Sequence, residues 1–82
     1  MTRAEILEEL KTIMRQIDGH NDKVIDECTE ESNLKNELGL NSIAMLYLVV
    51  VLQEKFDISF DDAKMEDFKV LGDVISYIEG EM

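Results

Sequence analysis

The chain has 82 residues, 45% of them hydrophobic, which is the size and composition of one small globular domain covering residues 1–82. Its 19 acidic and 8 basic residues give a formal net charge of −11, which disfavours nucleic acid and anionic membranes as partners and favours basic protein surfaces. The single cysteine excludes an internal disulfide, and we find neither a signal peptide nor a membrane-spanning run, so we expect a soluble cytoplasmic protein and take it to be a monomer.

The first predicted helix begins at the N-terminus and ends before Gly19. Thr2 and Glu5 have the spacing of a capping box, which pairs backbone N–H groups that the first helical turn leaves free. Apolar residues then recur three or four positions apart, on one helix face: Ile6, Leu10, Ile13, Met14 and Ile17. Gly19 follows directly and is the expected helix stop.

Residues 19–41 lack sustained periodicity, and we predict a long loop here. A connection of this length is unusual in a compact domain, and it is commonly functional or held in place by its own side chains. Isolated apolar residues are expected to hold the loop against the core: Val24, Ile25, Leu34, Leu38 and Leu40.

Residues 42–56 are predicted to form the second long helix, although the sequence YLVVVL also has the β-branched content of a strand. Ser42 is a good N-cap, the segment is long for a strand, and no other part of the chain offers a pairing partner. A helix that is apolar nearly all round is expected to be central, with neighbours on several sides.

The last third of the chain is predicted to hold a short helical turn and a final helix. Asp61 and Asp62 are candidate caps for the short turn, in which Met65 and Phe68 face inward. The final helix is expected to end near Gly80 and is indicated by residues at helical spacing: Leu71, Val74, Ile75 and Ile78. The predicted fold class is all-α, a small bundle of three main helices plus one short helix, with a long loop between the first and second helices.

The acidic residues are unevenly distributed along the chain. Residues 18–37 hold seven acids and two bases, and residues 57–81 hold eight acids and two bases. The segment 42–56 carries only Glu54 and Lys55. The acidic residues are therefore concentrated in the connecting segments and in the C-terminal third of the chain.

Enzymatic and metal-binding chemistry finds little support in the sequence. His20 follows the first helix, where we expect it to interact with the helix dipole rather than act as a base. Cys28 has no CxxC partner, and its acidic neighbours are expected to raise the pKa of the thiol. The stretch DISFDD lacks the glycine and the closing glutamate of a calcium loop. We therefore expect neither an enzyme nor a metal site.

Several stretches together carry a family resemblance. They are LGLNSI at residues 38–43, a long apolar helix that ends in EKF, and then DISFDD and VLGDVISYIEG. From about residue 34 to residue 80 the chain resembles an acyl carrier protein, a family whose motif is Leu-Gly-x-Asp-Ser-Leu. The triplet at residues 41–43 is weak evidence on its own. Its combination with Gly39, with Phe56 fourteen residues after Ser42 and with the final helix is strong evidence.

The resemblance implies that Ser42 carries a covalent 4′-phosphopantetheine arm, which a phosphopantetheinyl transferase moves from coenzyme A. The thiol of the arm then carries acyl or aminoacyl groups as thioesters between loading enzymes, synthases and transferases. A helix N-terminus also suits a phosphodiester on physical grounds, because it presents free N–H groups and a partial positive charge. Ser42 is therefore expected to be both a cap and an attachment point, in a carrier for fatty-acid, polyketide or related specialised biosynthesis.

The chain departs from the family pattern around this serine. Asn41 replaces the family aspartate, and Ala44, Tyr47 and Gln53 occupy positions that usually carry exposed acids on the docking helix. These replacements favour a dedicated carrier of a specialised pathway over the housekeeping fatty-acid carrier. They also predict that partners dock beside Ser42 mainly through apolar contacts.

Tyr47 is the expected anchor of this docking surface, because tyrosine offers a large contact area at little entropic cost. Val51 is a second candidate contact. Acids such as Glu37 and Asp62 are expected to attract basic groups of the partner at the edge of this docking surface. The alternative is that Tyr47 simply packs against the long loop.

If the chain is a carrier, the acyl thioester on its arm must be protected from solvent. Candidate residues to line a space for an acyl chain are Met45, Met65 and Phe68, because methionine adapts to irregular volumes. Ordinary core packing is the favoured interpretation for each of them taken singly.

A rival hypothesis treats the protein as a non-catalytic acidic helical adaptor. Such an adaptor would bind a basic partner through the acidic C-terminal third, and Ser42 would be only a helix cap. Intact mass after exposure to a transferase and coenzyme A distinguishes the two hypotheses.

Overall fold

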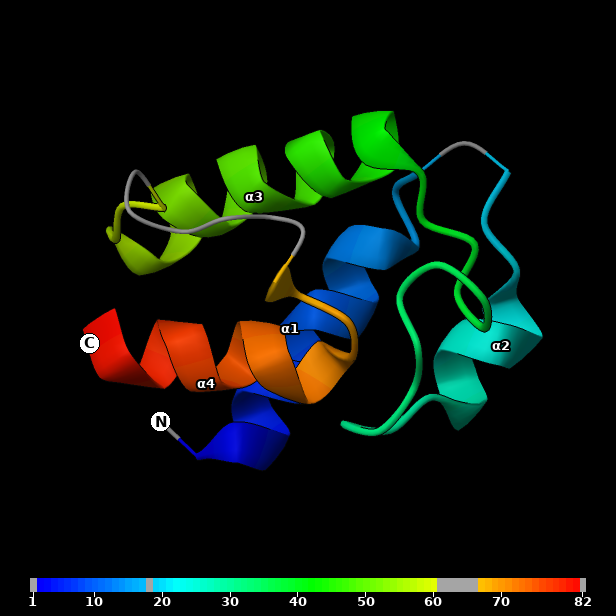
Figure 1. Ribbon diagram of the computed structural model, residues 1–82, viewed down its shortest axis with the longest axis horizontal. Helices are drawn as coiled ribbons and strands as arrows, with labels where there is room; N and C mark the ends of the chain where they lie inside the picture. The colour runs from blue at the N-terminus through cyan, green and yellow to red at the C-terminus, as the bar shows by residue number, and fades with distance from the viewer. Residues whose placement is uncertain (1, 18, 61–66, 82) are drawn as a thin grey trace.

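The computed structural model describes residues 2–17, 19–60 and 67–81, and these residues form an all-α bundle (Figure 1). The helices are α1 (Arg3–Met14), α2 (Asp22–Glu27), α3 (Ser42–Phe56) and α4 (Leu71–Glu81). The described residues form three main helices and a short one, with a long loop before α3, which agrees with the predicted fold class, although the short helix α2 is not at the predicted position. None of the described helices is both long enough and apolar enough to span a bilayer.

Helix α1 begins with the predicted capping box. The Thr2 hydroxyl accepts a hydrogen bond from the backbone N–H of Glu5 (3.2 Å), and the Glu5 carboxylate accepts one from the backbone N–H of Thr2 (2.9 Å). The helix ends at Met14, earlier than predicted, because the backbone N–H groups of Gln16 and Ile17 bond to carbonyls three residues back (3.0 and 3.2 Å) instead of four. Gly19 lies beyond this turn with a φ of +79°, a conformation that favours glycine.

Helix α2 was not predicted, because residues 19–41 were expected to be a loop throughout. The Asn21 side chain accepts a hydrogen bond from the backbone N–H of Val24 (3.2 Å) and caps this helix, and Ile25 is its buried residue. A helix of six residues is too short to produce a sustained hydrophobic period. The short helical turn that we predicted from Asp61 and Asp62, with Met65 inside, lies outside the described residues.

The loop between α2 and α3 is attached to the start of α4 by backbone hydrogen bonds. The N–H of Leu34 donates to the carbonyl of Lys69 (2.9 Å), and the N–H of Gly72 donates to the carbonyl of Glu30 (2.8 Å). A Cβ on Gly72 would lie 3.1 Å from that Glu30 oxygen, so this close approach favours glycine. The loop is therefore a fixed part of the bundle.

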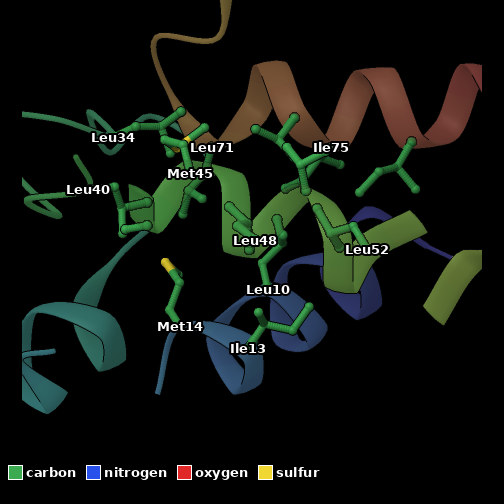
Figure 2. Close-up of a cluster of buried hydrophobic side chains, with 14 of the residues drawn as sticks. Leu10, Ile13, Met14, Leu34, Leu40, Met45, Leu48, Leu52, Leu71 and Ile75 are labelled. Carbon is green, nitrogen blue, oxygen red and sulfur yellow. The ribbon is translucent and has the colours of Figure 1, made fainter. Parts of the chain in front are cut away.

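The hydrophobic core lies between the three long helices and is closed by the loop (Figure 2). The predicted core residues within α1 and α4 are buried, whereas Ile17, which was predicted on the same face, lies beyond the end of α1 and is half-buried. Three of the five loop residues expected to contact the core are also buried, namely Ile25, Leu34 and Leu40. Val24 and Leu38 are half-buried. Helix α3 contributes one face of buried residues: Ala44, Met45, Leu48, Val49 and Leu52.

Helix α3 is not surrounded on several sides, which corrects our expectation. Figure 1 shows α1 and α4 on one side of it. On its other face Ile43, Leu46, Tyr47 and Val50 are 80%, 58%, 39% and 44% exposed. An apolar sequence shows that a helix can be buried all round, but the number of neighbours depends on the rest of the chain, which offers only two other long helices among the described residues.

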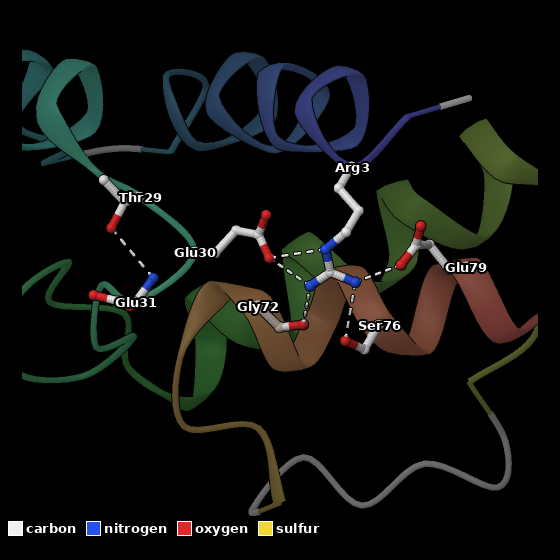
Figure 3. Close-up of polar contacts among 7 residues, drawn as sticks. All are labelled: Arg3, Thr29, Glu30, Glu31, Gly72, Ser76 and Glu79. Atoms are coloured by element: carbon white, nitrogen blue, oxygen red, sulfur yellow. Dashed lines mark hydrogen bonds and ion pairs between the residues drawn. The ribbon is translucent and has the colours of Figure 1, made fainter.

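Arg3 joins three segments of the bundle, α1, the loop before α3 and α4 (Figure 3). Its guanidinium forms ion pairs with Glu30 of the loop and Glu79 of α4, and it also donates to the Ser76 hydroxyl (3.2 Å) and the Gly72 carbonyl (3.4 Å). The hydrogen bonds from Arg3 lower the pKa of the Glu30 carboxyl. We call Arg3, Glu30 and Glu79 the Arg3 cluster.

Candidate functional site

Ser42 is the first residue of α3, and its helix cap is the preceding residue. Asn41 has extended backbone angles, and its side-chain oxygen accepts a hydrogen bond from the backbone N–H of Ala44 (2.8 Å). The prediction that Ser42 is the cap was therefore wrong. Both residue types cap well, and the cap lies one position earlier than we expected. The Asn41 oxygen fills the capping role that an aspartate would fill.

This displacement leaves the Ser42 hydroxyl available. The residue is exposed, and its hydroxyl makes no hydrogen bond with any residue that the structure describes. Within the same part of the chain, the backbone N–H groups of Ser42 and Ile43 also have no acceptor. The first turn of α3 contains no acidic residue. A free hydroxyl beside free N–H groups at a helix N-terminus fits a covalently attached phosphodiester.

The turn before α3 fixes the position of this helix start. Gly39 has a φ of +66°, and a Cβ on this residue would meet no atom within 4 Å, so backbone conformation and not crowding favours glycine there. The next residue, Leu40, is buried, and its N–H donates to the carbonyl of Leu34 (2.8 Å). Ser42 is therefore held two residues from an anchored position.

A hollow of about 630 Å³ lies beside Ser42. Its lining comes from the end of α1, from α2, from residues 36–40 and from the first residues of α3. Asn41, Ile43 and Ala44 contribute to it, whereas the predicted cargo-lining residues Met45 and Phe68 do not. This hollow was not predicted, because no local pattern connects the separate segments that build it.

The predicted cargo-lining residues have other places in the fold. Met45 is buried in the core. Phe68 packs edge-on against Phe60 and Tyr77, with ring centroids 6.2 and 5.8 Å away. Met65 lies outside the described residues. Core packing is therefore the observed role of the two that are described.

The positions predicted for partner docking differ in exposure. Ala44 is buried, and the Gln53 side chain accepts a hydrogen bond from the backbone N–H of Phe60 (3.0 Å). Val51 is half-buried. Ala44 and Val51 are thus poorly placed to contact a partner, and Gln53 is engaged in holding the chain after α3.

Tyr47 is the docking candidate that the structure leaves partly exposed. Its hydroxyl donates to the Gln16 side chain (3.1 Å), so it contacts the turn after α1 in addition to lining the hollow. The neighbours that share its exposed face are Ile43, Leu46 and Val50, which we call, with Tyr47, the apolar face of α3. These three neighbours were not predicted to be docking residues, although they lie opposite the buried face of the helix.

His20 and Cys28 have structural surroundings. The Nδ1 atom of His20 lies 2.7 Å from the carbonyl oxygen of Ile17, and its Nε2 atom lies 2.9 Å from the Asp22 carboxylate, in the turn between α1 and α2. Burial raises the pKa of the Cys28 thiol, whereas we had expected the acidic neighbours to be the cause. No group of three or more potential metal ligands is found among the described residues.

Glu37 is exposed and lines the hollow, which agrees with a place near the docking surface. Asp62, the other acid predicted to steer partners, lies outside the described residues. The charged residues of α3 are remote from its start, and Lys55 pairs with Glu9 of α1. The surroundings of Ser42 are therefore largely uncharged.

Comparison with known proteins agrees with this geometry. Residues 8–78 match the protein-family model described as a phosphopantetheine attachment site. Acyl carrier proteins of Exiguobacterium sibiricum and Thermotoga maritima are 35% and 33% identical to the chain over 79 and 78 residues, which cover 96% and 95% of this chain and 96% and 93% of the relatives. That of Wolinella succinogenes is 41% identical over 54 residues, 66% of this chain and 71% of the relative.

These matches decide against the adaptor hypothesis, because they cover nearly the whole chain and not only its acidic third. The chain belongs to the acyl carrier protein family, a family of non-catalytic carriers with 4′-phosphopantetheine as prosthetic group that serve fatty-acid or related biosynthesis.

Proposed function

We propose that Ser42 is the residue that carries the 4′-phosphopantetheine arm, in a single carrier domain formed by residues 1–82. The observation that carries this proposal is the exposed Ser42 hydroxyl, free of hydrogen bonds within the described chain, at the first position of α3. The free N–H groups of Ser42 and Ile43 stabilise the negative charge of the phosphodiester. When bound, the arm supplies a thiol that holds acyl groups as thioesters.

The partners follow from this chemistry. A phosphopantetheinyl transferase modifies Ser42 from coenzyme A, and loading enzymes, synthases and acyl or aminoacyl transferases then use the carrier. The transferase and its metal ion supply the catalysis, so Ser42 needs no base of its own. We place this work in the cytoplasm, where the free and buried Cys28 remains reduced.

We infer further that partners dock near Ser42 mainly through the apolar face of α3. Ile43 adjoins Ser42 and is 80% exposed, and Leu46, Tyr47 and Val50 continue the same face along the helix. A partner that reaches the Ser42 arm therefore covers these side chains. Their burial gives an apolar centre to the contact, and Glu37 adds a charge at its rim. The apolar face of α3 supports a role in a specialised pathway, because a partner surface that carries only basic patches does not complement an apolar surface.

Intact mass spectrometry tests the attachment site. After incubation with coenzyme A and a permissive transferase, the protein should gain the mass of one phosphopantetheine, and Ser42→Ala should gain none. Ser59→Ala is the matched control, since it removes a serine at another position and should be modified normally. A modified Ser42→Ala protein, or a wild-type protein that several permissive transferases leave unmodified, would reject the assignment.

A further inference from the structure

The exposed side chain of Asn41 has one polar atom that the fold uses and one that it does not. Its amide oxygen accepts the hydrogen bond from the backbone N–H of Ala44 (2.8 Å), which caps α3. Because an N–H group needs an acceptor, this contact fixes which end of the amide faces the helix. The amide nitrogen, at the other end of the group, makes no hydrogen bond with any residue that the structure describes.

This unused donor lies on the residue that precedes Ser42. Consecutive Cα atoms are about 3.8 Å apart, and both side chains are exposed at the start of α3. A phosphodiester on the Ser42 oxygen has its phosphorus one bond beyond that oxygen, so a donor on the neighbouring residue can reach its anionic oxygens. The amide nitrogen of Asn41 therefore joins the free backbone N–H groups of Ser42 and Ile43 as a third donor.

Neutral donors are the groups that this site offers to an anion. No lysine or arginine lies among the described residues that line the hollow beside Ser42. The same lining includes Glu37, whose charge opposes an anion, and His20, whose ring contacts the Asp22 carboxylate (2.9 Å). A phosphodiester on Ser42 therefore depends on N–H donors and not on an ion pair with a lining residue.

An aspartate at position 41, as in the family motif, could cap the helix but could not donate. Asparagine and aspartate are equally good N-cap residues, because each offers an oxygen acceptor. The aspartate has a second carboxylate oxygen in place of the amide NH₂ group, with no hydrogen to donate and a negative charge beside the phosphodiester. Asn41 therefore keeps the cap and replaces a repulsive neighbour of the phosphodiester by a donor.

We propose that Asn41 is a positioning residue for the arm, in which the amide oxygen caps α3 and the amide nitrogen donates a hydrogen bond to the phosphodiester on Ser42. This inference rests on the proposed attachment at Ser42, and it adds the side chain that holds the first group of the arm. An arm held at its phosphate has fewer conformations beside the apolar face of α3. A partner that docks there therefore binds the arm at a lower entropic cost.

The test compares the apo and holo forms of the whole protein, with holo forms prepared from coenzyme A by a permissive transferase and confirmed by intact mass. The measured quantity is the melting temperature of the holo form minus that of the apo form. In the wild type this difference should be about +2 to +4 °C, the size expected for one hydrogen bond to a charged group in a domain of this length. Asn41→Asp should abolish or reverse the increase, although its apo form remains capped and folded.

Two further variants separate the lost donor from the added charge. Asn36→Asp places the same charge at another exposed asparagine of the hollow lining and should keep the increase. Asn41→Gly keeps an acceptable N-cap residue without charge and without an amide, and it should lose the increase. In about 1 M salt, where the Debye length is about 3 Å, Asn41→Asp should still lack most of the increase, because screening does not restore a donor.

Nuclear magnetic resonance of the wild type gives a measurement that needs no variant. The side-chain N–H resonances of Asn41 should move downfield on conversion from the apo to the holo form, because a hydrogen bond to an anion deshields the donated hydrogen. Those of Asn36 should stay in place. Circular dichroism establishes that each variant used in the melting experiment is folded.

The outcomes separate this inference from the proposed attachment. With the arm on Ser42, an equal increase in all four proteins or unmoved Asn41 resonances would overturn the role of Asn41. A full increase in Asn41→Gly, or complete recovery of Asn41→Asp in high salt, would also overturn it, since charge alone would then explain the data. A protein that gains no arm at Ser42 would reject the attachment site, and the inference with it.

Discussion

The two faces of α3 have the same apolar character and opposite surroundings. One face packs Met45, Leu48 and Leu52 into the core, and the other leaves Ile43 and Leu46 more than half exposed. Burial accounts for the first face through the hydrophobic effect. Exposed apolar groups of the second face contribute little to folding, and a continuous exposed patch of this kind marks an interaction site. In α3, residue type therefore does not distinguish the residues that stabilise the fold from those expected to contact partners, whereas the exposed fraction of the side chain does.

The same contrast extends to two regions of the molecule. The region that carries the Arg3 cluster is held by ion pairs and hydrogen bonds between α1, the loop and α4. The region that carries Ser42 has a free hydroxyl, free N–H groups within the described chain and an open hollow. Near Ser42, where a prosthetic group and partners are expected to bind, hydrogen-bonding groups thus have no partner within the described chain. In the Arg3 cluster, which serves only the fold, the charged groups are paired.

The largest expected effect compares two leucines of the same helix. Leu48 is 0% exposed and Leu46 is 58% exposed. Leu48→Ala should lower the free energy of unfolding by about 2–5 kcal/mol, because it removes buried methyl groups and leaves a cavity. Leu46→Ala should change it by no more than about 0.5 kcal/mol. Urea unfolding followed by circular dichroism measures both, and similar losses in the two variants would remove the distinction between the faces.

The second effect concerns partner docking on the exposed face. Tyr47→Ala should lower kcat/KM for loading by the dedicated partner about tenfold, as for an aromatic anchor at the centre of an interface. Glu54→Ala, on the same helix, should have little effect. Raising the salt concentration should weaken docking only modestly, because screening acts on the charged rim and not on the apolar centre.

Two results would contradict the apolar docking surface. Full loading activity in Tyr47→Ala together with a steep loss of docking in salt would show that acids dominate recognition. Because the Tyr47 hydroxyl bonds to Gln16, Tyr47→Phe is the necessary companion variant. It removes the hydrogen bond and keeps the ring, so it should load nearly as well as the wild type.

Long periodic segments of this fold were predictable, and features that depend on three-dimensional neighbours were not. The buried faces of α1 and α4 follow from helical spacing, and the bounds of α3 agree with the predicted residues 42–56. Helix α2 was not predicted, because six residues are too few to show a helical repeat of apolar residues. The cap of α3 was misplaced by one residue, since Asn41 and Ser42 are both good caps and only the backbone angles decide between them.

The candidate site shows the same division. Ser42 could be proposed from the family motif, because that motif is local in sequence. Tyr47 was predicted as a docking residue, but its three neighbours on the apolar face of α3 and the hollow were missed, because each depends on which elements pack nearby and not on residue type alone. Asp62 and Met65 remain predictions, since they lie outside the described residues.

The third effect separates the cap from the attachment residue. Asn41→Ala should lower the free energy of unfolding by about 1 kcal/mol, because the Ala44 N–H loses its side-chain acceptor. Ser42→Ala should lower it by no more than about 0.3 kcal/mol, because alanine is a good helix former and no hydrogen bond within the described chain is lost. Thermal or urea unfolding measures both. A larger loss in Ser42→Ala than in Asn41→Ala would show that the serine is the cap.

The smallest effect should come from the Arg3 cluster at acid pH. Hydrogen bonds from Arg3 lower the pKa of Glu30 in the folded protein below its unfolded value, which is about 4.3 for a free glutamate side chain. The folded state then binds this proton less readily, so the pair stabilises the fold fully above the unfolded pKa, and the stabilisation is lost as pH falls through the folded pKa. Glu30→Gln should therefore be less stable than the wild type at pH 7, and the difference should shrink below about pH 4. Because both side chains are more than one-third exposed, the difference should be small and should also diminish in high salt. Unfolding midpoints in urea, measured for both proteins across this pH range, decide the matter. A difference that is constant with pH would mean that Glu30 acts through packing against Gly72 and not through its charge.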